Sequence, residues 1–269
     1  MLEKNIAFIG GGNMCRAIVN GLLMGGVSEC DRIRIRNRTP EKLLDFKKIG
    51  IYPAPTAHDA VEFADILFLA VKPQNFDEVL DEIAGENFDK KTVVSIAAGI
   101  TIKHINEKLG KNVAVVRAMP NTPMLIGLGA VGVCRNENVS DAVYDEICSA
   151  FEKMAVVTKL SDEDMINKII PVSGSSPAFV YLFIKIICDW AKENGFDEET
   201  AKKLVCATFE GSARMLLQSS DSPDKLIRDV SSPGGTTLAA LAEFEKAGIT
   251  DIMRTAMDAC LKRAYELSK

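Results

Sequence analysis

The chain has 269 residues, 47% of them hydrophobic, and a formal net charge of −5. It is long enough to bury one large core or two ordinary ones, and it lacks the clustered lysine and arginine excess of nucleic-acid-binding proteins. Its seven cysteines are odd in number, widely spaced and without a C-x-x-C pair, which argues against a disulfide framework or a metal site and fits a reducing compartment.

The residues before the first apolar run, which begins at Ile6, are few and polar, and that run stops at Gly10. No signal-peptide core is therefore expected. The most apolar helix-like segment, AFVYLFIKIICDWA, contains Lys185 and Asp189 and is shorter than the ~20 residues that a membrane-spanning helix needs. We expect a cytoplasmic protein that has no membrane partner.

Short apolar runs alternate with amphipathic stretches such as FDEVLDEIAG and TIKHINEKLG through the first 160 residues. The expected strands are 6–9, 32–36, 66–71, 92–95, 113–117, 131–134 and 156–159. Strands that alternate with helices predict βαβ units. We therefore expect residues 1–160 to form an α/β domain of Rossmann type, with a doubly wound parallel sheet.

The sequence pattern changes after Ser161. The segment ETAKKLVCATFEGSARMLLQ places its apolar residues at helical spacing, and no further strand is expected. Residues 161–269 are therefore expected to form an all-helical domain. Because the helix over 179–190 has little polar face, we expect this domain to form a homodimer or a larger homo-oligomer.

The stretch FIGGGNMCRAI places glycines 10–12 directly after the first expected strand and before a helix over 14–23. In this context the first glycine permits a tight turn, the second lets backbone approach a pyrophosphate, and the third motif position, here Cys15, takes a small residue. The helix N-terminus offers free N–H groups to phosphate oxygens. The pattern predicts a dinucleotide site; a glycine-rich turn without a ligand is the alternative.

The second expected strand ends in RNRTP, which has no acidic residue for a ribose 2′-hydroxyl. It offers Asn37, Arg38 and Thr39 instead, and the arginine fork suits a 2′-phosphate. NADPH is therefore the favoured cofactor, with NADH possible. Arg34 is interpreted as part of a solvated strand edge.

Two proline-containing loops follow later strands, AVKPQ after the strand over 66–71 and RAMPNTP after the strand over 113–117. Ligands bind beyond the carboxyl ends of strands in such sheets. We expect Asn121 and Thr122 to hydrogen-bond a nicotinamide carboxamide, and ordinary rigid turns are the alternative.

Two segments of the helical domain are rich in small polar residues. VSGSSPAFVYLF has serines ahead of Pro177, as at a capped helix start. DVSSPGGTTLAALAEFEKAG places two serines, a Pro-Gly-Gly turn and two threonines before a helix, a concentration of N–H and hydroxyl groups that suits a small carboxylate.

The motifs FIGGGNM, AVKPQ, SIAAGI, RAMPNTP, SGSSPAF and SSPGGTT, in this order over essentially the whole chain, resemble the pyrroline-5-carboxylate reductase family. The resemblance implies NAD(P)H-dependent reduction of 1-pyrroline-5-carboxylate to L-proline, the last step of proline biosynthesis. It also implies a Rossmann domain followed by a helical domain that forms an interlocked dimer.

The same resemblance implies the residues of the site. The implied cofactor contacts are Gly10, Gly11, Gly12, Asn13, Met14, Cys15, Asn37, Arg38, Ala70, Val71, Lys72, Pro73, Ala98 and Asn121. The implied substrate contacts are Glu163, Ser232, Gly235, Thr236 and Thr237, with Asp229 as a weaker candidate. Thr237 is the expected donor to the imine nitrogen, and a helix cap is its alternative role. Ala57 stands where relatives often carry an asparagine that contacts the adenosine ribose, which puts that contact in question.

The inventory of side chains agrees with imine reduction. Neither histidine, His58 nor His104, lies in an expected ligand-facing loop, which argues against a histidine-dependent hydroxyacid dehydrogenase. A cyclic imine needs a proton at nitrogen and a hydride at carbon, so the protein must mainly position and polarise. Two alternatives remain: a related NADPH enzyme with Lys168 or Lys185 as acid, and a non-catalytic NADPH-sensing module.

Overall fold

The computed structural model describes residues 3–109 and 113–268. Gly110, the last residue of the TIKHINEKLG pattern, and the outermost residues of the two expected domains lie outside them. By its contacts the chain divides into a sheet unit, Met1–Pro177 with Cys260–Lys269, and a helical unit, Ala178–Ala259. The domain limits 1–160 and 161–269 stay a prediction, because they rest on sequence pattern and not on contacts.

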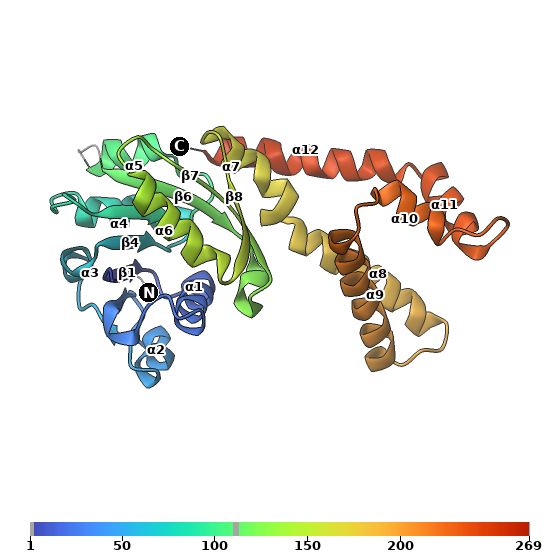
Figure 1. The fold of residues 1–269 in the computed structure, drawn as a ribbon, viewed down its shortest axis with the longest axis horizontal. Helices are drawn as coiled ribbons and strands as arrows, with labels where there is room; N and C mark the ends of the chain where they lie inside the picture. Colours follow the sequence, from blue (N-terminus) through green and yellow to red (C-terminus); the bar gives the residue numbers. More distant parts are fainter. Residues whose placement is uncertain (1–2, 110–112, 269) are drawn as a thin grey trace. The chain divides into compact units, whose positions relative to one another are not determined.

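The sheet unit contains eight strands in the order β3-β2-β1-β4-β5-β6-β7-β8 (Figure 1). The strands are β1 (Ile6–Ile9), β2 (Ile33–Arg36), β3 (Tyr52–Pro53), β4 (Ile66–Leu69), β5 (Thr92–Ser95), β6 (Ala114–Pro120), β7 (Gly129–Arg135) and β8 (Ala155–Lys159). The predicted α/β fold is confirmed with one correction, because β6 and β7 pair antiparallel while the other neighbours are parallel. The connection 121–128 is too short for the crossover that a parallel pair requires.

Helices cover both faces of this sheet (Figure 1). One core cluster joins it to α1 (Asn13–Met24), α2 (Leu44–Lys48) and α6 (Asp141–Glu152). The other cluster joins it to α3 (Ala57–Phe63), α4 (Phe76–Ile83), α5 (Ile102–Leu109) and α7 (Asp164–Ile169). Successive residues of β1 enter opposite clusters, because side chains alternate along a strand and both faces are covered.

Short 3₁₀ turns complete the sheet unit, and the described residues from Ser176 onward contain five helices. The turns are η1 (Cys30–Arg32), η2 (Pro40–Leu43), η3 (Pro73–Asn75) and η4 (Thr122–Ile126), and a π-helical turn, η5 (Ile170–Gly174), follows α7. The helices are α8 (Ser176–Glu193), α9 (Glu198–Gln218), α10 (Pro223–Asp229), α11 (Thr236–Lys246) and α12 (Ile249–Leu267).

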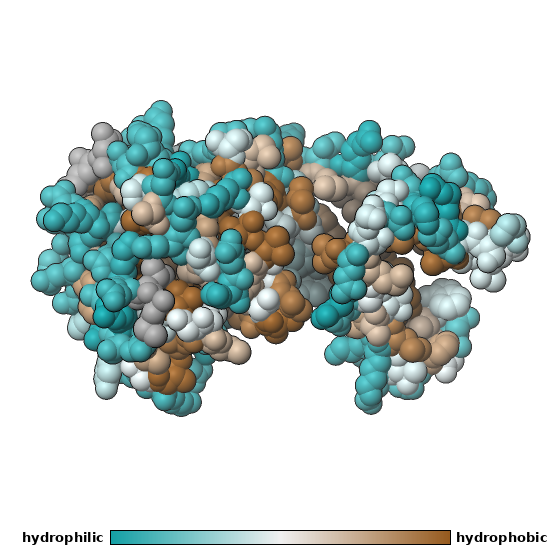
Figure 2. Space-filling view, in the orientation of Figure 1, coloured by the Kyte–Doolittle hydropathy of each residue, from teal (hydrophilic) through white to brown (hydrophobic). Residues whose placement is uncertain are grey.

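The helical unit buries few of its own apolar side chains. In α8 only Ala191 is buried, whereas Leu182, Ile186 and Trp190 are 54%, 54% and 62% exposed. Apolar side chains accordingly reach the surface of this unit in Figure 2. Contiguous apolar surface of this kind marks a contact with another protein or with a membrane.

One helical run in the described part of the chain, Asp164–Glu193, is long and apolar enough by length and composition to cross a membrane. The expectation that the apolar segment is too short is therefore wrong. The helical run is longer than its apolar sequence pattern because α7, the π-helical turn and α8 follow one another with only a bend at Ser175 between the last two. Length and composition alone do not separate a membrane span from a helix at a subunit interface.

Candidate functional site

The three-glycine turn brings the ends of β1 and β4 into close contact. Gly10 has φ of +112°, and a Cβ atom there would lie 2.4 Å from the carbonyl oxygen of Ala70. Both the backbone conformation and the space therefore demand glycine. The turn thus lies against the first residue of the AVKPQ loop, at the carboxyl edge of the parallel strands.

The N-terminus of α1 is open at this turn. Gly12 is the N-cap residue, its backbone is extended, and no side chain caps the helix. A Cβ atom at Gly12 would meet no other heavy atom within 4 Å. The first N–H groups of the helix are therefore available to a phosphate, as the sequence predicts. Cys15 is fully buried, and burial raises the pKa of its thiol, so it serves as a small packing residue.

Asn37 holds the turn in place. Its Oδ1 accepts from the N–H of Gly11 at 2.9 Å, and its Nδ2 donates to the carbonyl of Thr39 at 2.8 Å. The side chain thus joins the glycine turn to the RNRTP segment. A direct cofactor contact by Asn37 stays a prediction.

Arg38 is exposed beside the first turn of α4. Its Nη1 lies 3.4 Å from Glu78 Oε2, and its side chain is 73% exposed. An exposed ion pair of this kind is weak, so an incoming phosphate can replace the carboxylate. Arg34, expected at a solvated edge, is instead half-buried with its guanidinium 4.7 Å from the ring centre of Phe63, because its flat face stacks on an aromatic ring.

The remaining predicted cofactor residues lie at the ends of β4, β5 and β6. Ala70, Val71, Pro73 and Ala98 are half-buried and Lys72 is exposed. Asn121 is buried; its Nδ2 donates to the carbonyl of Ser173 at 3.1 Å and its Oδ1 accepts from the N–H of Ala130 at 2.9 Å. The Asn121 side chain thus holds the loop after β6 through these two hydrogen bonds. Its contact with a nicotinamide stays a prediction.

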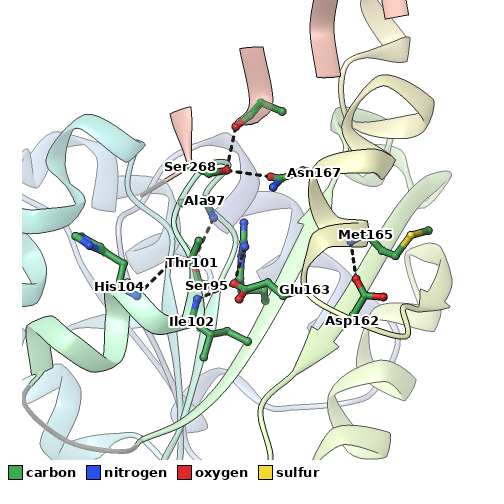
Figure 3. A network of polar contacts seen from close by, with 12 residues as sticks. Ser95, Ala97, Thr101, Ile102, His104, Asp162, Glu163, Met165, Asn167 and Ser268 are labelled. Carbon is green, nitrogen blue, oxygen red and sulfur yellow. Dashed lines mark hydrogen bonds and ion pairs between the residues drawn. The ribbon is translucent and has the colours of Figure 1, made fainter. Parts of the chain in front are cut away.

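An ion pair between a buried arginine and a half-buried glutamate lies behind this edge of the sheet. Arg117, in the middle of β6, is 1% exposed, and its Nη1 donates to Glu163 Oε1 at 2.6 Å. The same oxygen accepts from the N–H of Ile102 at 2.6 Å, as part of the network in Figure 3. The sequence analysis assigned no role to Arg117. An arginine inside the apolar run of β6 was nevertheless a signal of a buried charge. Burial beside this pair raises the pKa of Cys134 to about 11.

The predicted substrate residues Ser232, Gly235, Thr236 and Thr237 belong to the helical unit. Gly234 has φ of +69°, and the N–H of Gly235 donates to the carbonyl of Ser232 at 2.9 Å, which closes the turn. The N–H of Gly235 is thus bonded within the turn, and a substrate contact by Gly235 stays a prediction. The N–H groups of the first turn of α11 remain available to a carboxylate.

Thr237 is not a helix cap. The N-cap of α11 is Gly235, with no side-chain cap, so Thr237 lies inside the first turn. It is half-buried and Thr236 is exposed. Asp229, the weaker candidate, accepts from Lys225 Nζ at 2.6 Å.

The two lysines of the alternative mechanism are both paired. Lys168 Nζ lies 2.6 Å from Asp164 and Lys185 Nζ lies 2.5 Å from Asp189. The hydrogen bond that each lysine donates to its carboxylate raises the pKa of that lysine, which makes each a weaker acid. The described residues contain no group of side chains suited to a metal ion, and the seven cysteines are free.

Comparison with known proteins gives two family matches. Residues 163–267 match the family model described as pyrroline-5-carboxylate reductase dimerisation, and residues 5–99 match NADP oxidoreductase, coenzyme F420-dependent. The pyrroline-5-carboxylate reductase of Corynebacterium melassecola is 37% identical over 98% of both chains, and that of Escherichia coli K12 is 36% identical over the full length of both. The chain belongs to the pyrroline-5-carboxylate reductase family.

Solved structures of the pyrroline-5-carboxylate reductase family agree with this assignment. The enzyme from Coxiella burnetii has a TM-score of 0.89 at 38% identity over 99% of both chains. The Plasmodium falciparum enzyme, solved with NADP bound, has a TM-score of 0.91 at 26% identity over 100% of both. The family resemblance inferred from the motifs is therefore confirmed.

The glycine turn generates the first testable prediction. Gly10→Ala should lower the free energy of unfolding by about 3 kcal/mol, because a side chain there combines a strained φ with a backbone clash. Gly26→Ala is the matched control, since Gly26 also has a positive φ, +64°, but no neighbouring atom within 4 Å. It should cost about 1 kcal/mol. Urea denaturation measures both; equal losses would contradict a close approach at Gly10.

Proposed function

We propose that this chain reduces 1-pyrroline-5-carboxylate to L-proline with NADPH as the hydride donor, the last step of proline biosynthesis. Membership of the family supports the reaction, and the uncapped, open N-terminus of α1 beside Gly12 is the observation that supports the cofactor. NADH remains a possible second donor. Purified protein that binds NADPH but does not oxidise it when the imine is added would overturn the proposal.

The proposed cofactor site lies along the carboxyl edge of β1, β2, β4, β5 and β6. The pyrophosphate would lie on the first turn of α1, over residues 10–15, and the 2′-phosphate beside Arg38. The remaining proposed contacts are Asn37, Ala70, Val71, Lys72, Pro73, Ala98 and Asn121. The dinucleotide, when bound, supplies a hydride; the residues of the chain bind it, orient it and exclude water.

The proposed substrate site is the segment SSPGGTT of the helical unit. The first-turn N–H groups of α11 hold the substrate carboxylate, because a helix N-terminus carries unpaired donors and a partial positive charge. The hydroxyl of Thr237 donates to the imine nitrogen, and Ser232 and Thr236 complete the polar wall. A hydroxyl within the first turn and not at the cap is free to take this role.

The proposed assembly is a homodimer or a larger homo-oligomer through the C-terminal helices. The dimerisation match covers residues 163–267, and it includes the exposed apolar side chains of α8. Association between copies covers this surface without a membrane. A cytoplasmic location fits the free cysteines and the bacterial relatives.

Arg38→Ala tests the cofactor contact. Loss of one charge-assisted phosphate contact costs about 1.5–3 kcal/mol, so kcat/KM for NADPH should fall roughly 10- to 100-fold. The value for NADH, which has no 2′-phosphate, should stay within twofold. Glu78→Gln is a useful partner variant, since it removes the competing carboxylate and should lower the KM for NADPH. An equal loss with both cofactors after Arg38→Ala would show that Arg38 does not read the phosphate.

Thr237 is tested by three variants. Thr237→Ala and the isosteric Thr237→Val should each lower kcat by about 10- to 1000-fold, since both remove a positioned proton donor. Thr237→Ser should recover most of the rate because it keeps the oxygen. NADPH affinity and Tm should barely change. If Thr237→Val turns over normally, the donor is another group.

The apolar face of α8 is tested by charge insertion. Ile186→Glu and Trp190→Glu should shift the protein toward the monomer in sedimentation velocity and abolish activity, since a buried unpaired carboxylate opposes association. Lys202→Glu, at an exposed position of α9, should leave the assembly intact. A wild-type protein that sediments as an active monomer, or that binds lipid vesicles, would contradict the proposed assembly.

A further inference from the structure

We propose that Arg117 and Glu163 form a positioning pair that fixes the loop 96–101, and that Glu163 acts on hydride transfer through this loop without contacting the substrate. The inference rests on the proposed function, because the loop contains Ala98, a proposed cofactor contact. It changes the role of Glu163, which the family resemblance placed among the substrate contacts.

Arg117 lies at a buried position, where a charged side chain is unfavourable for folding. It lies in the middle of β6, opposite Ser95 of β5 and Cys134 of β7 in the strand register. Among the fully buried side chains of the described residues, it has the largest volume. Desolvation of a guanidinium opposes folding, and a buried pair is often no better for stability than an apolar pair of similar size. Stability is therefore a poor reason for this arginine.

The hydrogen bonds of Arg117 support the same conclusion. Its Nη1 is paired with Glu163, while its Nη2 is buried without a partner among the described residues. A pair built for stability would satisfy both nitrogens, because an unpaired buried donor carries a desolvation penalty. The geometry instead directs one strong bond to one carboxylate oxygen.

That oxygen connects three elements of the sheet unit. Glu163 is the residue at the start of α7, and its Oε1 accepts from Arg117 in β6 and from the N–H of Ile102, the first residue of α5. Both distances are 2.6 Å. The carboxylate therefore fixes the point at which the loop 96–101 enters α5.

The loop is held at two further points, of which Figure 3 shows the one between Ala97 and Ser95. Near its start, the N–H of Ala97 lies 3.5 Å from Ser95 Oγ. In its middle, Gly99 has φ of +76°, and a Cβ atom there would lie 2.5 Å from the carbonyl oxygen of Leu267. A loop held at its start, middle and end has little freedom, and the contact at its end involves the charge of Glu163.

The C-terminal residues that lie against Gly99 are themselves hydrogen-bonded to α7. Tyr265 Oη donates to Asp164 Oδ1 at 2.8 Å, and Ser268 Oγ donates to Asn167 Oδ1 at 3.2 Å. The first turns of α7 thus support the loop 96–101 twice, directly through Glu163 and indirectly through the C-terminal residues. A change in the angle of α7 would shift both supports together.

Such fixing matters for the proposed reaction because hydride transfer depends on the position of the reacting atoms. Reacting atoms must approach to about 3–3.5 Å, and a misplacement of about 1 Å by a remote change can cost about 100-fold in rate. With the backbone of the loop 96–101 beside the nicotinamide, as proposed, a displacement of the loop would also displace the ring. Affinity for the whole dinucleotide would change little, since the phosphate contacts lie at α1.

Glu163→Gln is the principal test, because it keeps the shape and one acceptor oxygen while removing the charge. Single-turnover hydride transfer is followed by loss of NADPH fluorescence and expressed per bound NADPH, so that unfolded molecules do not count. We expect a 10- to 100-fold slower transfer, with the NADPH Kd and the imine KM each within threefold of wild type. Arg117→Lys keeps the charge but loses the planar fork, and it should slow the same step.

Asp145→Asn is the matched control, since Asp145 is a carboxylate of the same unit that pairs with Lys159 at the surface, away from the loop 96–101. It should transfer hydride within threefold of wild type. An unchanged rate per bound NADPH in both test variants would overturn the proposal. A raised imine KM with an unchanged transfer rate would also overturn it, in favour of a direct substrate contact. Wild-type protein without turnover would overturn the proposed function, and this proposal with it.

Discussion

The contact between Gly10 and Ala70 is the constraint on which the proposed site depends. The chain order of the sheet reverses at β1, with β2 on one side and β4 on the other, and such a point is where open α/β sheets bind ligands. Because the backbone of Gly10 lies against the carbonyl of Ala70, there is no room for a side chain at position 10. The helix that follows is then left with an uncapped N-terminus that faces open space. Asn37 fixes this arrangement through the N–H of Gly11.

The short helix α7 lies at the start of the dimerisation match and also contacts the loop 96–101 through Glu163. The dimerisation match begins at its N-cap residue, Glu163, and the same residue anchors the loop 96–101 through Ile102. The helical run that leads into the exposed apolar helix α8 thus starts at a carboxylate that holds a proposed cofactor loop. In the proposal made above, interactions that orient α7 act on the geometry of hydride transfer through this loop.

Much of the fold was predictable because its signals are local. Apolar runs located seven of the eight strands, and the glycine turn was recognisable from its place between a strand and a helix. Strand β3 was missed because two residues, Tyr52 and Pro53, carry no periodicity. The antiparallel pairing of β6 and β7, and the bond between Arg117 and Glu163 across 46 positions, depend on contacts between distant residues. Local sequence patterns do not predict such contacts between distant residues.

The proposed chemistry also explains why the sequence shows so few candidate acids and bases. Both histidines pair with carboxylates of the sheet unit, His58 with Glu86 and His104 with Asp77, and the paired lysines of α7 and α8 are weak acids. A hydride acceptor with a basic nitrogen needs one proton and a fixed geometry, so a hydroxyl and a few N–H groups are sufficient. Such a site depends on backbone position more than on the pKa of side chains. Glycines at φ of +112° and +76° and a buried arginine behind the sheet edge are the features that fix this backbone position.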